Sequence, residues 1–197
     1  MACVHHFAQQ RAGAVFRVAQ AGMQDFHDVE AHVQSDQIGK RLLRPIGWAA
    51  FNATRIEAGR PIFGIDFDDQ VLPAETGPLQ MERAVSFTKG CYPGQEIVAR
   101  MHARNQTARQ IVGFRMDEDF LPIAGAQIFD DQSSVVGAVT SSTISPVLSG
   151  ASIGLALVKR THIETGRVLH IPAEGAIRTG KVSELPFIKS ETGSVNT

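Results

Sequence analysis

The chain has 197 residues, 43% of them hydrophobic, and its 19 basic and 20 acidic side chains give a net charge of −1. This length is enough for one large domain or two small ones with a real core. The balanced charge, without a long run of either sign, argues against a protein that binds nucleic acid directly or a membrane surface. No apolar run approaches the roughly 18 residues of a membrane span, and residues 1–10 lack the apolar core of a signal peptide, so a cytoplasmic protein is expected.

Two helices and a strand are predicted in the first 60 residues. Residues 14–19 have the β-branched and aromatic composition of a strand, and residues 25–33 have the apolar spacing of a short helix. A second helix is predicted over residues 47–58, with Gly59 as its stop signal. The residues expected on one face of that helix are Trp48, Phe51 and Arg55. Residues 61–73 begin and end with proline and are expected to form an extended loop region.

The octapeptide over residues 89–96 reads Lys-Gly-Cys-Tyr-Pro-Gly-Gln-Glu and concentrates unusual chemistry in a short stretch. A helix is predicted from Pro93 through about His102, because the apolar residues that follow have helical spacing. Cys91 would then lie just before a helix N-terminus, where unpaired N–H groups, the helix dipole and Lys89 all favour thiolate over thiol. The pattern predicts a reactive cysteine; the alternative is a small buried residue with a structural role.

Cysteine and histidine usage limits the other kinds of site. The second cysteine, Cys3, is far from Cys91 in the sequence, so the two thiols form neither a disulfide framework nor a ligand set for an iron–sulfur cluster. None of the seven histidines falls into a zinc-ligand pattern, so no metal site is expected. The chain also lacks the glycine-rich loops that bind nucleotide phosphates.

After about residue 107 the apolar period changes from 3.6 to 2, which predicts a change from helices to short strands. The expected strands cover residues 111–116, 126–129, 134–140, 152–158, 167–171 and 177–185. Six short strands without helices between them predict a small antiparallel barrel or sandwich. The fold class is therefore α+β, with a first domain over residues 1–107 and a β-barrel domain over residues 108–190.

The octapeptide resembles the signature of the YgfZ family, which are folate-binding proteins related to the glycine-cleavage T-protein, an aminomethyltransferase. The similarity continues in residues 54–67 and 72–77, and again in the strands after residue 137, so it covers roughly residues 47–187. It implies a truncated aminomethyltransferase-like folate-binding domain followed by a small antiparallel C-terminal β-barrel. It also implies tetrahydrofolate as the cofactor and iron–sulfur proteins as partners, among them tRNA-modifying enzymes, whose cluster assembly or repair the protein would support.

The resemblance assigns roles to individual side chains. Cys91 is expected to be the catalytic thiol at the mouth of the folate cleft, and Glu57 is expected to face the pterin ring. The full set of expected folate contacts is Arg55, Glu57, Lys89, Tyr92 and Gln95. For each there is a plainer alternative: a solvated charge for the first three, a packing role for the tyrosine, and a structural place in the first helical turn for the glutamine.

Proteins of this family carry a long N-terminal region, and most of it has no counterpart here. The expectation is a fragment, a wrongly started reading frame or a shortened relative, and an oligomer in which a second copy completes the pocket stays open. In the T-protein branch the catalytic aspartate lies in that unmatched region.

Whether the chain is an enzyme therefore stays open. The alternatives to the YgfZ role are an aminomethyltransferase of the glycine cleavage system and a non-enzymatic module whose barrel docks a partner. Cys91 stands where T-proteins usually carry a bulky apolar residue, which speaks against the first of these.

Overall fold

The computed structural model describes residues 47–87, 90, 92, 94–104 and 107–188, which lie in one unit of the chain over residues 46–197. Its helices are α1 (Trp48–Glu57), α2 (Pro78–Ala84) and α3 (Gln95–Arg104), with short 3₁₀ turns η2 (Pro73–Thr76) and η3 (Arg160–His162). Its strands are β1 (Arg109–Met116), β2 (Gln127–Phe129), β3 (Val135–Ser145), β4 (Ala151–Lys159), β5 (Val168–Ala173) and β6 (Ala176–Ser183). The strand predicted over residues 14–19 and the helix predicted over residues 25–33 lie outside the described residues.

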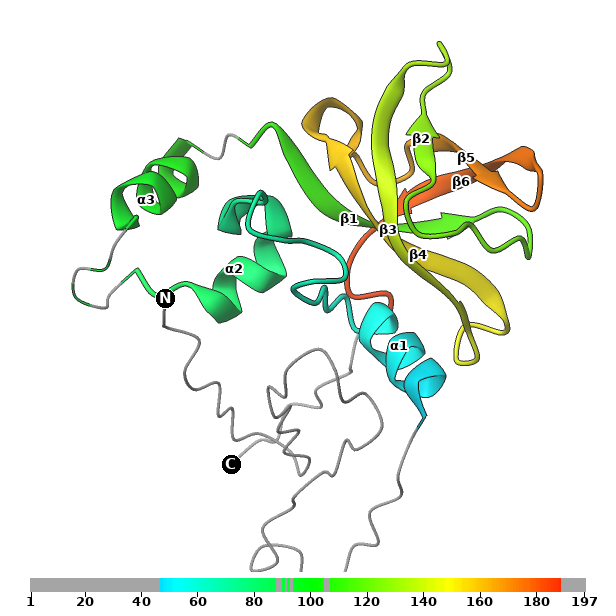
Figure 1. The fold of residues 1–197 in the computed structure, drawn as a ribbon, viewed down its shortest axis with the longest axis horizontal. Coiled ribbons are helices and arrows are strands. Elements are labelled where there is room, and N and C mark those ends of the chain that lie inside the picture. Colours follow the sequence, from blue (N-terminus) through cyan, green and yellow to red (C-terminus); the bar gives the residue numbers. More distant parts are fainter. Residues whose placement is uncertain (1–46, 88–89, 91, 93, 105–106, 189–197) are drawn as a thin grey trace, which may run out of the picture. The chain divides into compact units, whose positions relative to one another are not determined.

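The six strands close into one antiparallel barrel in the order β1-β4-β3-β2-β5-β6 (Figure 1). The predicted α+β chain with a small antiparallel barrel is therefore confirmed. The largest difference in strand length concerns β3, which continues to Ser145 instead of ending at Thr140. Its second half contains the polar run Ser141-Ser142-Thr143, which looks like a turn in the sequence but pairs with β4 in the structure.

The barrel interior is filled by apolar side chains from all six strands. The largest fully buried ones are Phe114, Ile128, Leu169 and Ile171, each 0% exposed. They alternate with outward-facing residues along their strands, as the period of 2 in the sequence requires. A glycine makes room for the ring of Phe114, because a β-carbon at Gly154 would lie 2.4 Å from Phe114 Cζ.

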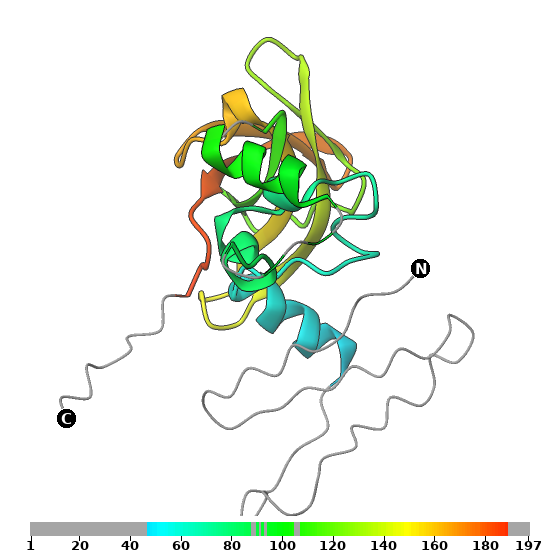
Figure 2. The ribbon, with the colours of Figure 1, turned by 90° about the vertical axis from the view of Figure 1, so that its left-hand side faces the viewer.

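A second apolar cluster lies where α1 packs against β3 and β4 on the outside of the barrel (Figures 1 and 2). Ile56 of α1 is 0% exposed and packs with Ile111, Ile153 and Leu155. The predicted helix is confirmed. Of the residues expected on one of its faces, Trp48 is 59% exposed, whereas Arg55 is buried. The second apolar cluster explains the exposure of Trp48. Ile56, near the end of α1, packs against the strands, and Trp48 lies two turns away from it along the helix.

The segment between α1 and α3 is more ordered than an extended loop. Phe63 and Phe67 are joined by a backbone bridge across a turn at Gly64, which has a φ of +82°, and their rings meet edge to face. Helix α2 and the turn η2 follow, and neither was predicted. The division into domains at residue 107 stays a prediction.

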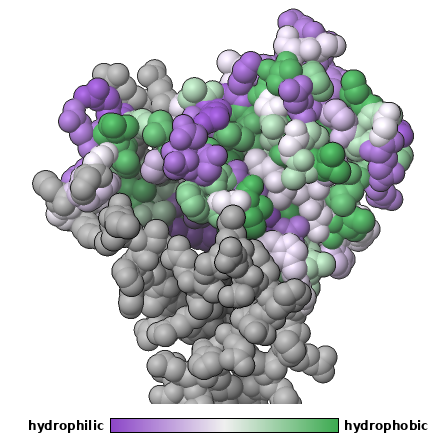
Figure 3. Space-filling model, in the orientation of Figure 1, coloured by the Kyte–Doolittle hydropathy of each residue, from purple (hydrophilic) through white to green (hydrophobic). Residues whose placement is uncertain are grey.

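On the face shown in Figure 3, hydrophilic and hydrophobic side chains lie side by side in small groups. Among the described residues, no helix combines the length and apolar character needed to cross a membrane.

Candidate functional site

The described part of the octapeptide lies at the start of α3. The backbone N–H of Tyr92 donates to Gln95 Oε1 at 3.4 Å, and both side chains are half-buried. Gly94 has a φ of +84°, a conformation that side chains with a β-carbon rarely adopt, so a glycine is required to turn the chain into the helix. Lys89 and Cys91 lie outside the described residues, so the predicted thiolate and its cation stay predictions.

Arg55 is held inside the protein. Its side chain is 3% exposed, and Nη1 donates to Asp66 Oδ2 at 2.6 Å. Nε donates to Asn52 Oδ1 at 2.9 Å, and Nη1 also lies 3.4 Å from the carbonyl oxygen of Arg60. The guanidinium is therefore neither a solvated charge nor directed to open solvent.

Asp66 accepts hydrogen bonds on both carboxylate oxygens. Oδ2 accepts from Arg55 and from the backbone N–H of Ile62 at 2.8 Å, while Oδ1 accepts from the Ser141 hydroxyl at 2.5 Å. Thr140 Oγ1 lies 2.9 Å from Oδ1 and 3.0 Å from the carbonyl oxygen of Leu155, so these two acceptors share its single proton. The Asp66 side chain is 0% exposed, so the desolvation of the charge is offset by donors from three parts of the chain.

A bulge in β3 explains how two neighbouring residues reach one oxygen. Consecutive side chains of a regular strand point to opposite faces. The register of β3 with β4 shifts between Val139 and Ser141. This bulge redirects one side chain, so Thr140 and Ser141 both meet Asp66 while Val139 stays in the barrel interior.

Glu57 is the third buried charge of this region. Its Oε1 accepts a short hydrogen bond from Ser145 Oγ, at the end of β3, and Ser145 Oγ in turn accepts from the backbone N–H of Leu148 at 3.1 Å. The carbonyl oxygen of Glu57 accepts from the N–H of Phe187 at 2.9 Å and of Ile188 at 3.3 Å. Arg55 and Glu57 thus point to different partners, as their predicted separation of about 200° on the helix requires.

A further carboxylate attaches the segment before α2. Glu75 accepts from the N–H of Leu72 at 3.0 Å and lies 3.3 Å from Arg109 Nε, at the start of β1. Arg109 also donates to the carbonyl oxygen of Gln70 at 2.8 Å. Three carboxylates from residues 57–75 therefore bind the barrel.

Sequence reasoning named Arg55 and Glu57 but missed their partners. Asp66 stands inside a segment that carries the family resemblance, and that was its only signal. The hydroxyls of Thr140, Ser141 and Ser145 gave a weaker one, as polar residues that interrupt an otherwise apolar alternation.

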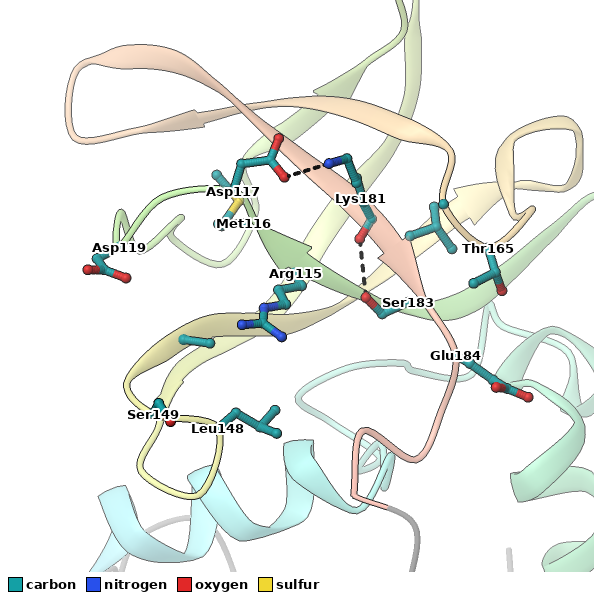
Figure 4. A pocket seen from close by; sticks show the side chains of 13 residues that line it. Arg115, Met116, Asp117, Asp119, Leu148, Ser149, Thr165, Lys181, Ser183 and Glu184 are labelled. Atoms are coloured by element: carbon teal, nitrogen blue, oxygen red, sulfur yellow. Dashed lines mark hydrogen bonds and ion pairs between the residues drawn. The ribbon is translucent and has the colours of Figure 1, made fainter.

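A hollow of about 570 Å³ opens on the barrel beside the turn between β3 and β4 (Figure 4). Arg115 points into it from β1, while Lys181 of β6 pairs with Asp117 at 3.1 Å. The hydrogen bond from Lys181 lowers the pKa of the Asp117 carboxyl below its ordinary value; burial opposes this shift, and a hydrogen bond from Thr179 adds to it. Of the predicted site residues that the structure describes, none lines this hollow, and its mixed charges select no ligand class.

A smaller hollow of about 290 Å³ lies between residues 64–71 and the barrel, with Asp66 and Arg109 in its wall. Neither hollow is lined by Tyr92 or Gln95. Within the described residues, no group of three or more histidine, cysteine, aspartate or glutamate side chains could hold a metal ion.

Comparison with known proteins gives these elements a context. Residues 109–189 match the family model of the glycine cleavage T-protein C-terminal barrel domain. The chain is 30% identical over 146 residues to an aminomethyltransferase of Prosthecochloris aestuarii, covering 74% of this chain and 39% of that protein. An aminomethyltransferase of Saccharopolyspora erythraea is 32% identical over 156 residues, covering 79% and 41%.

A crystal structure of the glycine cleavage system aminomethyltransferase T from Bartonella henselae has the same fold over 73% of this chain and 39% of that one, with a TM-score of 0.64 and 24% identity. The chain spans about two fifths of the length of these relatives. The finer assignment to the YgfZ family stays a prediction. The chain is thus related to the glycine-cleavage T-proteins, and its barrel matches their C-terminal barrel domain.

Proposed function

We propose that the chain forms part of a tetrahydrofolate-binding protein of the aminomethyltransferase type. One observation carries this proposal: the alignments with aminomethyltransferases extend over 146 residues or more, well beyond the barrel match at residues 109–189. The segment from α1 to α3 therefore shares the relationship with the barrel. If an unrelated protein shared only the barrel fold, the segment from α1 to α3 would not align with aminomethyltransferases.

Tetrahydrofolate would supply the chemistry of a one-carbon carrier, and the protein would bind and orient it. Among the described residues, Tyr92 and Gln95 fit such a role. The half-buried phenol ring of Tyr92 suits stacking on a flat heterocycle. Gln95 accepts the Tyr92 N–H through its carbonyl oxygen, which leaves its amide N–H groups to donate to a ligand. Lys89, outside the described residues, is proposed as a clamp for an anionic tail.

Two chemistries are compatible with folate binding, and a separate observation favours each. The names of the relatives favour aminomethyl transfer. The octapeptide favours support of iron–sulfur proteins, because it resembles the YgfZ signature, and its cysteine stands before a helix N-terminus, where a thiolate is stabilised. In that second function Cys91 is the reactive group, and iron–sulfur enzymes are the partners.

The test begins with a calorimetric titration of the chain with tetrahydrofolate in the absence of oxygen. Saturable binding with one ligand per chain is expected, weakened about 5- to 150-fold in Tyr92→Ala, since a base or ring stacked on an aromatic side chain gains roughly 1–3 kcal/mol. Absence of binding by the wild-type chain would overturn the proposal.

The two chemistries are then separated by activity. Formation of methylene-tetrahydrofolate in a glycine-cleavage assay would establish aminomethyl transfer. Restoration of iron–sulfur enzyme activity in deficient cells, lost in Cys91→Ser and kept in the matched control Cys3→Ser, would establish the second function. These two are the chain's cysteines, so the control tests position and not thiol content.

A further inference from the structure

We infer that Arg55 and Glu57 do not contact a folate and instead fasten α1 to the barrel. Together with Asp66 they form a joint between α1 and the barrel. The hydrogen-bond donors of this joint on β3 are the hydroxyls of Thr140, Ser141 and Ser145. This gives the polar half of β3 a function: it positions the segment that connects α1 to the rest of the chain.

The direction of the hydrogen bond between Ser145 and Glu57 supports the inference. Ser145 is 0% exposed, and a hydroxyl carries a single proton. The backbone N–H of Leu148 donates to the Ser145 oxygen, so the hydroxyl proton is directed to Glu57. Glu57 itself is only 6% exposed, and its carbonyl oxygen is engaged by residues 187 and 188. One carboxylate oxygen of Glu57, Oε1, and its backbone carbonyl oxygen therefore serve the packing of α1.

The hydrogen bonds of Arg55 also indicate that its side chain holds α1 and does not contact a folate. A ligand contact would need a free donor that faces solvent, but the guanidinium is 3% exposed and binds Asp66 and Asn52. Within the described residues, the one buried side-chain nitrogen or oxygen without a partner is Arg178 Nε, on β6. The joint therefore has no buried donor or acceptor waiting for a ligand.

The residues bonded in the joint lie far apart in the sequence, so their bonds hold distant parts of the chain together. Glu57 and Ser145 are 88 residues apart, and Asp66 and Ser141 are 75 apart. Bonds between such distant residues fix the register of α1 against β3, because the Glu57 and Asp66 carboxylates accept from hydroxyls at set positions on β3. The apolar cluster around Ile56 alone would tolerate sliding, since burial is not directional.

The experiment compares Glu57→Gln with Glu57→Ala in the full chain. Gln keeps an oxygen that accepts from Ser145 but removes the charge that a pterin contact would need. For a joint, Glu57→Gln should change the melting temperature little and the tetrahydrofolate Kd less than about twofold. Glu57→Ala should lower the melting temperature by roughly 3–8 °C, the equivalent of one lost buried hydrogen bond in a chain of this size. Glu82→Gln, an exposed glutamate on α2, is the matched control.

A double-mutant cycle of Glu57→Ala and Ser145→Ala completes the test. The joint predicts that the double variant is no less stable than the worse single variant, because both remove the same bond. Strictly additive losses would overturn the inference, as would a Glu57→Gln variant that melts normally and no longer binds tetrahydrofolate. The measurement of tetrahydrofolate binding rests on the proposed function. If the wild-type chain binds no folate, the proposed function fails, and the double-mutant cycle alone tests the inference about the joint.

Discussion

The interior of the barrel and the joint on its outer face are held together by opposite kinds of side chain. The interior packs apolar residues whose burial has no preferred direction, so many combinations of similar volume would serve. The joint uses buried carboxylates that need donors at defined positions. We expect the interior to respond to lost volume and the joint to respond to single lost atoms.

The largest effect is expected in the interior, from Phe114→Ala. The ring is 0% exposed and packs directly against the backbone at Gly154, so the closed barrel cannot collapse into the space that it leaves. A loss of about 4–5 kcal/mol in the free energy of unfolding is expected, measured by urea denaturation. Phe114→Leu, which fills most of the volume, should lose less than half as much. Equal losses for the two variants would show that volume does not control the interior.

The joint should respond almost as strongly to a change that leaves volume unaltered. Asp66→Asn keeps the shape but replaces one acceptor oxygen by a donor and leaves Arg55 buried without a countercharge. Breaking a buried pair from one side usually costs about 3–5 kcal/mol, and we expect about 3, because Arg55 keeps its bonds to Asn52 and Arg60.

Urea denaturation measures this loss, and Asp119→Asn, an exposed residue, serves as its control. A cost below about 1 kcal/mol for Asp66→Asn would mean that the joint is dispensable.

The same contrast explains what the sequence could predict. The six strands were predictable because Ile128, Leu169 and Ile171 repeat a local alternation that a closed barrel always imposes. The joint was not, because its bonds connect residues 75 and 88 apart and depend on a bulge at Val139–Ser141 that no local pattern announces. The predicted strand therefore ends at residue 140, one residue before Ser141.

The predicted site residues also fall into two groups: those whose role a local sequence pattern indicates and those whose partners lie far away in the sequence. The octapeptide could be recognised because its residues lie together in the sequence, and Gly94 does begin the turn into α3. For Arg55 and Glu57 the sequence offered a ligand contact or a solvated charge. The structure adds a third possibility, burial against the barrel, which requires knowing that Ser145 and Asp66 lie opposite them. Composition alone cannot provide that knowledge.

A reciprocal exchange at the bulge tests the comparison at two adjacent residues. Val139→Thr places a hydroxyl among the apolar side chains of the interior and should cost about 2 kcal/mol. Thr140→Val removes the hydroxyl that Asp66 shares with the carbonyl oxygen of Leu155 and should cost about 1 kcal/mol. Both exchanges keep the β-branched shape, so the difference isolates the hydroxyl. The reverse order of the two losses would place Thr140, and not Val139, in the more demanding environment.

The smallest expected effect concerns Asp130, a carboxylate in the turn between β2 and β3 that lacks a buried countercharge. The N–H of Ser134 binds it at 2.9 Å and lowers the pKa of this carboxyl; burial opposes the shift, while the N–H of Gln132 and the nearby charges of His162 and Arg167 reinforce it. Because the folded pKa is lower than that of the unfolded chain, about 3.9, the ionised group stabilises the fold above that pH, and this contribution is lost as the pH falls through the folded value. Asp130→Asn should therefore melt below the wild type at pH 7, and the gap should close as the pH falls from 4 towards 2, measured by thermal melts at low salt. A gap that stays constant over that range would show that the charge contributes nothing, and that the turn, like the barrel interior, is held without it.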